Sequence, residues 1–215
     1  MRDLSRWTMQ LSLQAQLVML LMGAYAMVVG HAADRLLYDV LTLEVVVQLV
    51  ELAFYTFFVN RALSPLGMLQ LRYADWAVTT PLMLVSMFAL FQRHDDADTD
   101  LVSVVSRDPM TVARMLFFNA LMLGAGYLYT TGRLGQTASQ LIGFVALIAA
   151  FGELSTVVQP TDQVVFGITF LVWALYGIAA RQPVLSHRNA WYNMLDIVSK
   201  NVVGVYCAVL VLQAK

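Results

Sequence analysis

Long apolar runs separated by short polar connections make up most of the chain. A helix that crosses a membrane needs about 20 mostly apolar residues, and seven stretches reach that length. They cover roughly 9–30, 37–60, 68–91, 109–131, 135–155, 163–180 and 190–213. This pattern predicts an all-α membrane protein, a bundle of seven transmembrane helices in a single domain over residues 1–215. An odd number of spans places the two ends of the chain on opposite sides of the membrane.

Composition excludes several other classes of protein. Hydrophobic residues are 60% and charged residues 13% of the 215 positions, whereas about a quarter of a soluble domain is charged. The net charge of −1 gives no support for a nucleic-acid partner. The single cysteine, Cys207, excludes an internal disulfide and a cysteine-rich metal site. We expect no metal ion and no enzymatic activity.

The connections carry the charge. The longest, 92–108, contains Asp95, Asp96, Asp98 and Asp100 and is expected to be a solvated acidic loop. Arginines are slightly more frequent in the connections on the side of the N-terminus. By the positive-inside rule, this count leans weakly towards a cytoplasmic N-terminus.

One lysine stands inside an apolar run. Lys200 lies within Leu195–Leu212, four residues after Asp196, and the only other lysine is Lys215. An ammonium group at membrane depth costs about 2.5–3.5 kcal/mol on insertion scales. A carboxylate four residues earlier shares its helix face, and a lysine in an apolar pocket can form a Schiff base with a carbonyl compound. The alternative is a buried ion pair that only holds helices together.

The third span carries a second charged group of residues. Arg72, Asp75 and Thr79 follow i, i+3, i+7 spacing and share one helix stripe. Two carboxyl groups from different helices, Asp75 and Asp196, would suit a buried cation at Lys200. The alternative is a structural helix that holds an ion pair.

A proline interrupts the backbone bonding of the same span. Pro81 removes the hydrogen bond to the carbonyl of Ala77. The hydroxyls of Thr79 and Thr80 are expected to satisfy backbone groups that the proline frees.

Acidic and amide side chains follow the second span. Glu44, Gln48 and Glu51 follow i, i+4, i+7 spacing in an apolar surrounding, so they share one stripe. Such a stripe should face a hydrated interior and favour cations over anions. Further polar residues could complete the seam: Ser12, Gln16, Asn193 and Asn201. In the alternative, Glu44 lies near the membrane interface and Glu51 is a neutral packing residue.

These motifs resemble those of microbial rhodopsins. The segment 72–76 followed by 79–82 resembles their third helix, and 195–200 resembles their seventh. The segment 191–196 is similar to the version in proteorhodopsins, and the resemblance extends to bacteriorhodopsin. Residues of the fourth and sixth spans also fall at family spacing: Asn119, Met122, Gly124, Gly126, Trp173 and Tyr176.

The resemblance implies all-trans retinal bound to Lys200 as a protonated Schiff base. Asp75 would be the primary counter-ion and proton acceptor, Asp196 the second counter-ion, and Arg72 would complete the charged group. The implied retinal pocket consists of Trp76, Thr79, Thr80, Met83, Met122, Gly126, Trp173 and Tyr176. Aromatic and methionine side chains suit a flat apolar polyene. The alternative for each of them is ordinary helix packing.

Three positions depart from the family pattern. Gly177 stands where a proline is usual, and Ala180 where an aromatic residue is common, which predicts a looser pocket around the retinal ring. Ser86 occupies the position of the internal proton donor, eleven residues after Asp75. A serine does not hold a transferable proton as a carboxylic acid does, so return of a proton from the inside is expected to be slow or carried by water.

The acid stripe and the missing donor resemble the first group of giant-virus rhodopsins, which are light-gated cation channels. The expected function is a light-gated cation channel, with an outward proton pump and a sensory photoreceptor as alternatives. A non-rhodopsin transporter would show no visible absorption band. The expected partners are the lipid bilayer and translocated cations or protons, with a homo-oligomer left open. The family topology puts the N-terminus outside, against the arginine count.

Overall fold

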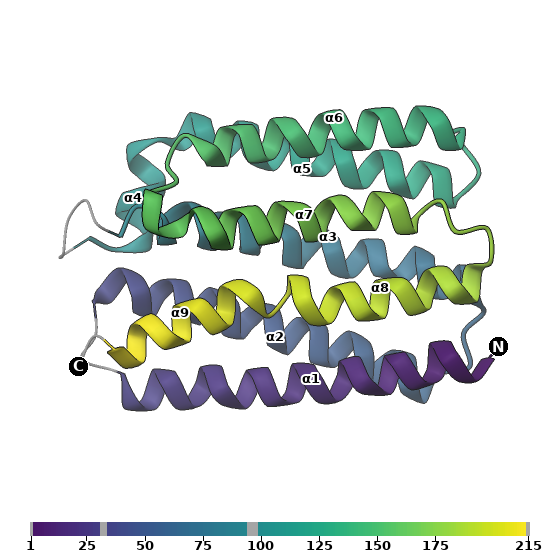
Figure 1. Ribbon diagram of the computed structural model, residues 1–215, viewed down its shortest axis with the longest axis horizontal. Coiled ribbons are helices and arrows are strands. Elements are labelled where there is room, and N and C mark those ends of the chain that lie inside the picture. Colours follow the sequence, from purple (N-terminus) through teal and green to yellow (C-terminus); the bar gives the residue numbers. More distant parts are fainter. Residues whose placement is uncertain (1, 31–33, 94–98, 214–215) are drawn as a thin grey trace.

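The structure is a computed structural model that describes residues 2–30, 34–93 and 99–213. Within these ranges, seven helical spans are long and apolar enough to cross a membrane. Five spans are single helices: α1 (Arg2–Val29), α2 (Arg35–Asn60), α3 (Pro65–Leu90), α5 (Pro109–Thr130) and α6 (Gln136–Ser155). The sixth joins η1 (Pro160–Asp162) to α7 (Gln163–Ala179), and the seventh joins α8 (Leu185–Ser199) to α9 (Val202–Gln213). The predicted all-α seven-helix bundle is confirmed (Figure 1).

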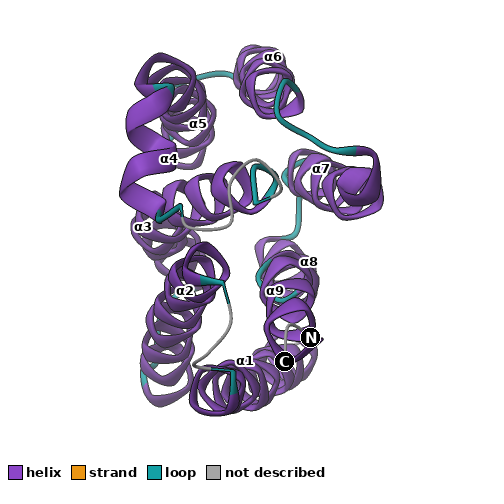
Figure 2. Cartoon of the chain, turned by 90° about the vertical axis from the view of Figure 1, so that its left-hand side faces the viewer, coloured by secondary structure: helices purple, strands orange, loops and turns teal. Residues whose placement is uncertain are grey.

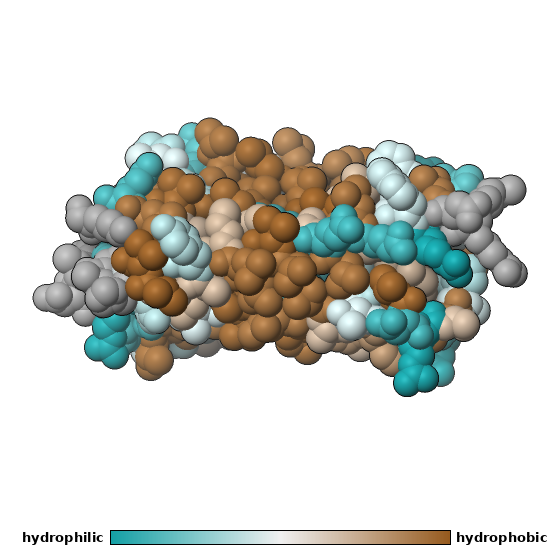
Figure 3. Space-filling model, turned by 90° about the horizontal axis from the view of Figure 1, so that it is seen from below, coloured by the Kyte–Doolittle hydropathy of each residue, from teal (hydrophilic) through white to brown (hydrophobic). Residues whose placement is uncertain are grey.

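The spans run side by side and alternate in direction, so α1 begins at one end of the bundle and α9 finishes at the other (Figure 1). Viewed end on, α2, α3 and α5 form one side, α6, α7 and the α8–α9 span form the other, and α1 closes one edge (Figure 2). On the face seen in Figure 3, hydrophobic side chains cover most of the middle, and most hydrophilic ones lie towards the two ends. This surface suits a bilayer, whose hydrocarbon core is about 30 Å thick.

Side-chain caps fix where several helices begin. Asp34 precedes α2 and its carboxylate accepts hydrogen bonds from the backbone N–H groups of Leu36, at 2.8 Å, and Leu37, at 3.3 Å. Ser64 precedes α3, and its hydroxyl oxygen accepts from the N–H of Gly67 at 3.0 Å. Both residues satisfy helix donors that have no partner inside the helix.

Two predicted spans begin too late in the chain. The first was expected to begin at residue 9 and the seventh at residue 190, whereas α1 begins at Arg2 and α8 at Leu185. Hydropathy marks only the apolar part of a span, and a helix continues beyond it where its polar residues have partners. In α1, the buried hydroxyl of Thr8 accepts a hydrogen bond from Asn193 at 2.9 Å.

The predicted acidic loop is partly wrong because it contains a helix, α4 (Leu101–Arg107). Asp100 caps it by accepting from the N–H of Ser103 at 2.8 Å. This bonding, together with an ion pair to Arg35 at 3.3 Å, holds the pKa of Asp100 below its ordinary value. Asp95, Asp96 and Asp98 lie outside the described residues.

The seventh span is broken at Lys200 and Asn201, between α8 and α9 (Figure 1). Gln48 on α2 bridges the break: its Nε2 donates to the carbonyl of Lys200 at 2.7 Å and to Oδ1 of Asn201 at 3.0 Å. The amide of Asn201 also donates to the carbonyl of Ile197 at 2.5 Å. A broken helix is stable at membrane depth only where protein groups satisfy its freed backbone, and Gln48 and Asn201 do this.

Pro81 lies inside α3 without ending the helix. The hydroxyl of Thr79 donates to the carbonyl of Asp75 at 3.1 Å, and that of Thr80 to the carbonyl of Trp76 at 2.7 Å. The prediction that these hydroxyls satisfy the carbonyl freed by Pro81, that of Ala77, is wrong, because each threonine bonds to the carbonyl four residues before it.

Candidate functional site

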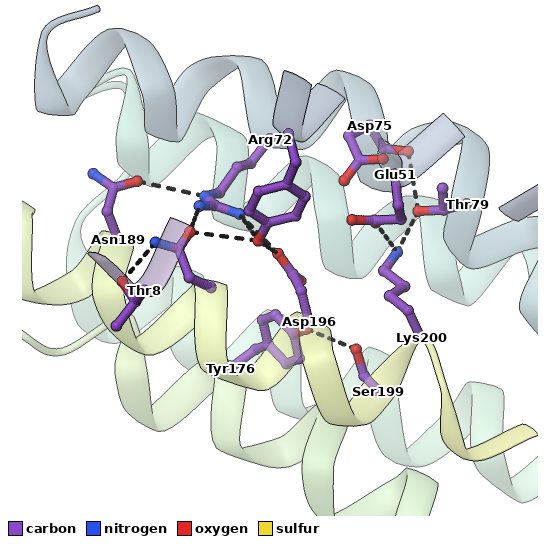
Figure 4. A network of polar contacts seen from close by, with 12 residues as sticks. Thr8, Glu51, Arg72, Asp75, Thr79, Tyr176, Asn189, Asp196, Ser199 and Lys200 are labelled. Carbon is purple, nitrogen blue, oxygen red and sulfur yellow. Dashed lines mark hydrogen bonds and ion pairs between the residues drawn. The ribbon is translucent and has the colours of Figure 1, made fainter. Parts of the chain in front are cut away.

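The lysine of the broken span meets acidic residues from α2 and α3. Lys200 Nζ lies 2.9 Å from Oε1 of Glu51, and the two side chains are 2% and 0% exposed. The same ammonium group donates to the hydroxyl oxygen of Thr79. The Asp75 carboxyl lies beside Glu51 (Figure 4), is 1% exposed, and its Oδ1 accepts no hydrogen bond from the described residues. Glu51, assigned to an ion pathway by its spacing, is thus the direct ion-pair partner of Lys200.

Asp196 has a different cation. Its Oδ2 lies 2.7 Å from Nη1 of Arg72, in an ion pair whose two side chains are fully buried. Tyr55 donates to the same oxygen at 2.5 Å, and Tyr176 donates to Oδ1 at 2.6 Å. Although Asp196 stands four residues before Lys200, its contacts are with Arg72 and the two tyrosines (Figure 4).

Two asparagines of α8 connect this ion pair to α1 and to the start of α3. Arg72 donates to the amide oxygens of Asn193 and, at 3.4 Å, of Asn189. Asn193 donates in turn to Thr8 on α1 at 2.9 Å, and Asn189 donates to the carbonyl of Pro65 at 3.0 Å. Asn193, expected in a polar seam, is therefore part of the Arg72 cluster, which lies towards the N-terminal end of α1.

A cavity extends from Lys200 towards α5, α6 and α7. Its walls include most of the expected pocket: Trp76, Thr80, Met83, Met122, Gly126, Trp173 and Tyr176. The remaining member, Thr79, contacts Lys200 instead. The rings of Tyr176 and Tyr192 meet the Trp76 ring edge to face, at centroid distances of 5.4 and 5.1 Å. The cavity is lined mainly by apolar and aromatic side chains and has an amine in its wall.

Glycines shape this cavity. A Cβ on Gly126 would lie 2.6 Å from the hydroxyl oxygen of Tyr73, and a Cβ on Gly177 would lie 2.6 Å from Cζ of Phe144. Side chains at these positions would collide with rings that line the cavity. Gly177, which departs from the usual proline, thus makes room for the Phe144 ring. Ala180 also lines the cavity.

Further buried polar atoms lie on α1, α2 and α3. Ser12 and Gln16 are fully buried, and the hydroxyl of Ser12 and both amide atoms of Gln16 have no hydrogen-bond partner among the described residues. The hydroxyl of Ser86 donates to Glu44, whose Oε2 has no partner there either. Ordered water is a common partner for buried polar atoms that bond to no protein group.

The end of the bundle near the last turn of α3 is closed by another ion pair. Arg93 lies 2.7 Å from Asp162 of η1. Tyr206 of α9 donates to Asp162 at 2.7 Å and accepts from Arg93 at 3.1 Å. This cluster joins the third, sixth and seventh spans.

Several residues of the site were missed from the sequence. Tyr55 extends the stripe of Glu44 and Glu51 at i+11, and Thr8 extends the stripe of Ser12 and Gln16 at i−4. The periodicity therefore contained a signal for both. Phe144 carried none, because its position depends on the packing of α6 against α7.

The chain belongs to the family of bacteriorhodopsin-like proteins, whose family model matches residues 7–214. No curated protein matches it. Among solved structures, it is similar to the viral rhodopsin OLPVRII, at 27% identity over 96% of both chains with a TM-score of 0.82. It shares its fold with the blue light-absorbing proteorhodopsin from Med12 (16% identity, 97% of both chains, TM-score 0.72). It also shares it with Exiguobacterium sibiricum rhodopsin (20% identity, 98% of this chain and 97% of that one, TM-score 0.73).

Microbial rhodopsins bind retinal through a Schiff base to a lysine, so this protein is a light-activated retinal protein of the membrane. The residues present fit the cofactor. The cavity is apolar, has Lys200 in its wall, and is bounded by Trp76 and Trp173. A Cβ on Gly143, which also lines it, would meet no atom within 4 Å and would enter open space.

Proposed function

We propose that this protein is a light-gated cation channel in which Lys200 carries retinal. The observation that carries the proposal is the run of buried polar atoms without protein partners on α1 and α2. Gln16 and Ser12 are fully buried, yet leave hydroxyl and amide groups unbonded, and Glu44 leaves one carboxyl oxygen unbonded. Leaving such groups unpaired in a dry interior costs about 1–3 kcal/mol each, so their retention is explained by water or a passing cation.

When bound, retinal supplies a light-driven change of shape beside the Lys200 nitrogen. The chain's own residues hold the closed state. Thr79 accepts a hydrogen bond from the Lys200 nitrogen, and Glu51 forms an ion pair with it. Gln48 holds the break in the helix by donating to the Lys200 carbonyl. Movement of Lys200 is therefore transmitted to α2 through Gln48 and Glu51, which stand on the same stripe as Glu44.

The acidic stripe determines the charge of the ions that can pass. Glu44 and Glu51 present carboxyl groups at two depths of the bundle, and such groups attract cations and repel anions. The two buried ion pairs, Arg72–Asp196 and Arg93–Asp162, lie towards opposite ends of the bundle and serve as its closed gates. We place the N-terminus outside, as in the family topology, so the Arg93 gate faces the cytoplasm.

Two substitutions test the proposal. Lys200→Ala should abolish the visible absorption band after retinal is added, and a retained band would contradict the assignment of Lys200. Gln16→Leu should strongly reduce the photocurrent, because an apolar side chain replaces amide groups that line the seam. Gln14→Leu is the matched control, because Gln14 is exposed on the same helix. Equal photocurrents in the two variants would remove the seam from the pathway.

One observation favours an outward proton pump as a second candidate. Ser86 occupies the position of the internal proton donor, and its hydroxyl donates to Glu44 of α2. Glu44 thus brings a carboxyl group to the position where α3 lacks one, and a buried carboxyl group can donate a proton. In a pump, Glu44→Gln should slow recovery of the dark absorption and leave an outward current of one sign. In a channel, the same change should alter ion selectivity.

A further inference from the structure

We propose that Glu51 and Asp75 form a carboxyl pair that holds one proton and carries a single negative charge opposite the Lys200 nitrogen. The inference rests on the proposed role of Lys200 as the retinal attachment site. It assigns to Glu51 a share of the counter-charge that the sequence motif alone gives to Asp75 and Asp196.

Contacts set the roles of the three carboxyl groups apart. Glu51 is the carboxylate in ion-pair contact with Lys200, at 2.9 Å. Asp196 is held by Arg72 at 2.7 Å and by hydrogen bonds from Tyr55 and Tyr176. The charge of Asp196 is therefore balanced by Arg72 rather than by Lys200.

The Asp75 carboxyl lies beside Glu51 (Figure 4). Lys200 attracts both groups, and as carboxylates they repel each other. Oε2 of Glu51 and Oδ1 of Asp75 are buried and accept no hydrogen bond from the described residues. Neighbouring carboxyl groups whose acceptor atoms lack a donor are what a shared proton relieves, because a protonated carboxyl group donates to its neighbour.

Charge counting agrees with this geometry. The site holds two cations, Lys200 and Arg72, and three carboxyl groups, Glu51, Asp75 and Asp196. Uncompensated charge in a buried site is costly, and one proton on the Glu51–Asp75 pair makes the site neutral. The charged and titratable groups that face the pair come from α2, α3, α7, α8 and the α8–α9 break, and they are Tyr55, Arg72, Tyr176, Asp196 and Lys200. Of these, only Arg72 and Lys200 are cations.

The pair should behave differently from a lone counter-ion. If Glu51 is neutralised, Asp75 loses the shared proton and keeps one negative charge near the nitrogen. If Asp75 is neutralised, Glu51 keeps that charge instead. Each single substitution should therefore shift the dark absorption maximum only slightly. Removal of both carboxyl groups removes the counter-charge and should give a large red shift, because the positive charge on the nitrogen loses its stabilising partner.

The test compares Glu51→Gln, Asp75→Asn and the double variant in detergent with all-trans retinal. Glu153→Gln is the matched control, because Glu153 lies on α6 and pairs with the exposed Arg114 at 2.9 Å. The expected red shift of the double variant exceeds twice the sum of the single shifts. Wild type and Glu153→Gln should also show a blue shift at alkaline pH, when the shared proton leaves, and both single variants should lack it.

A second readout needs no retinal. In the unloaded protein, the melting temperature should fall more for the double variant than for the two single variants added together, since only the double variant leaves Lys200 without a carboxylate. A full red shift for Asp75→Asn alone, unchanged when Glu51→Gln is added, would overturn the proposal. So would additive shifts, which indicate two ionised groups. By contrast, a visible band retained by Lys200→Ala would contradict the attachment site and leave the melting test of the pair intact.

Discussion

Removal of Arg72 should destabilise the protein far more than removal of a surface arginine. The Arg72–Asp196 pair has a separation of 2.7 Å and both side chains are fully buried. Loss of one partner from a buried pair costs about 3–5 kcal/mol, because the other charge stays buried alone. In proteins of this size, 1 kcal/mol corresponds to about 2–4 °C in melting temperature. Arg72→Met should therefore lower it by roughly 6–20 °C.

The matched control is Arg114→Gln. Arg114 pairs with Glu153 at 2.9 Å, but the two side chains are 48% and 21% exposed. Exposed pairs contribute about 1 kcal/mol or less, so the melting temperature should fall by no more than about 4 °C. Arg72→Met/Asp196→Leu removes both buried charges and should melt above Arg72→Met alone, since replacement of a whole buried pair by apolar groups is close to neutral.

The chain supplies its own reporter for this assay. Cys207 is the single cysteine and is fully buried, so a thiol-reactive fluorescent dye labels it only when the bundle opens. Melting curves are recorded for the retinal-free protein in detergent. If Arg72→Met melts within the range of Arg114→Gln, or if the double variant melts below the single one, the ion pair does not hold the bundle in the way described.

Three further predictions follow from single contacts. Gly177→Ala places a Cβ 2.6 Å from Phe144 and should shift the absorption maximum and slow retinal uptake. Gly167→Ala, on the same helix, adds a Cβ that meets no atom within 4 Å and should do neither. Equal behaviour of the two variants would remove Phe144 from the pocket wall. Gln48→Leu leaves the Lys200 carbonyl without its 2.7 Å donor and should lower the free energy of unfolding by about 1–3 kcal/mol. The loss is measured as a lower melting temperature with the same dye, and an unchanged melting temperature would show that the helix break does not need Gln48. Hydrogen bonds from Thr111 hold the pKa of Asp108 below its ordinary value. The stability that Asp108 adds is therefore present above the ordinary aspartate range and is lost as pH falls through the lowered pKa. The difference in melting temperature between wild type and Asp108→Ala should shrink below about pH 4, and a constant difference would contradict this.

The sequence predicted the fold because membrane helices need long apolar runs, and these are visible without any tertiary information. Family motifs also anticipated the cavity wall, from Trp76 to Tyr176. The pairing of charges was not predictable in the same way. Spacing of i−4 indicates that Asp196 shares a face with Lys200, but the break after Ser199 and the reach of Arg72 decide which cation Asp196 meets.

Glu51 shows the same limit more clearly. Its stripe on α2 indicated only an interior position, and the distance to Lys200 depends on how α2 packs against the broken seventh span. The helix within 92–108 was missed for a different reason. At seven residues, α4 is too short to leave a periodic signal, and the capping contact of Asp100 is a local feature.

The central claim is tested most directly by whole-cell voltage clamp under green light with added all-trans retinal. The photocurrent is recorded at several voltages and in two sodium gradients. A light-gated cation channel predicts a current that reverses sign, at a voltage that moves with the cation gradient. An outward current of one sign at every voltage would contradict the channel and identify a pump, with Glu44 beside Ser86 as its candidate proton donor.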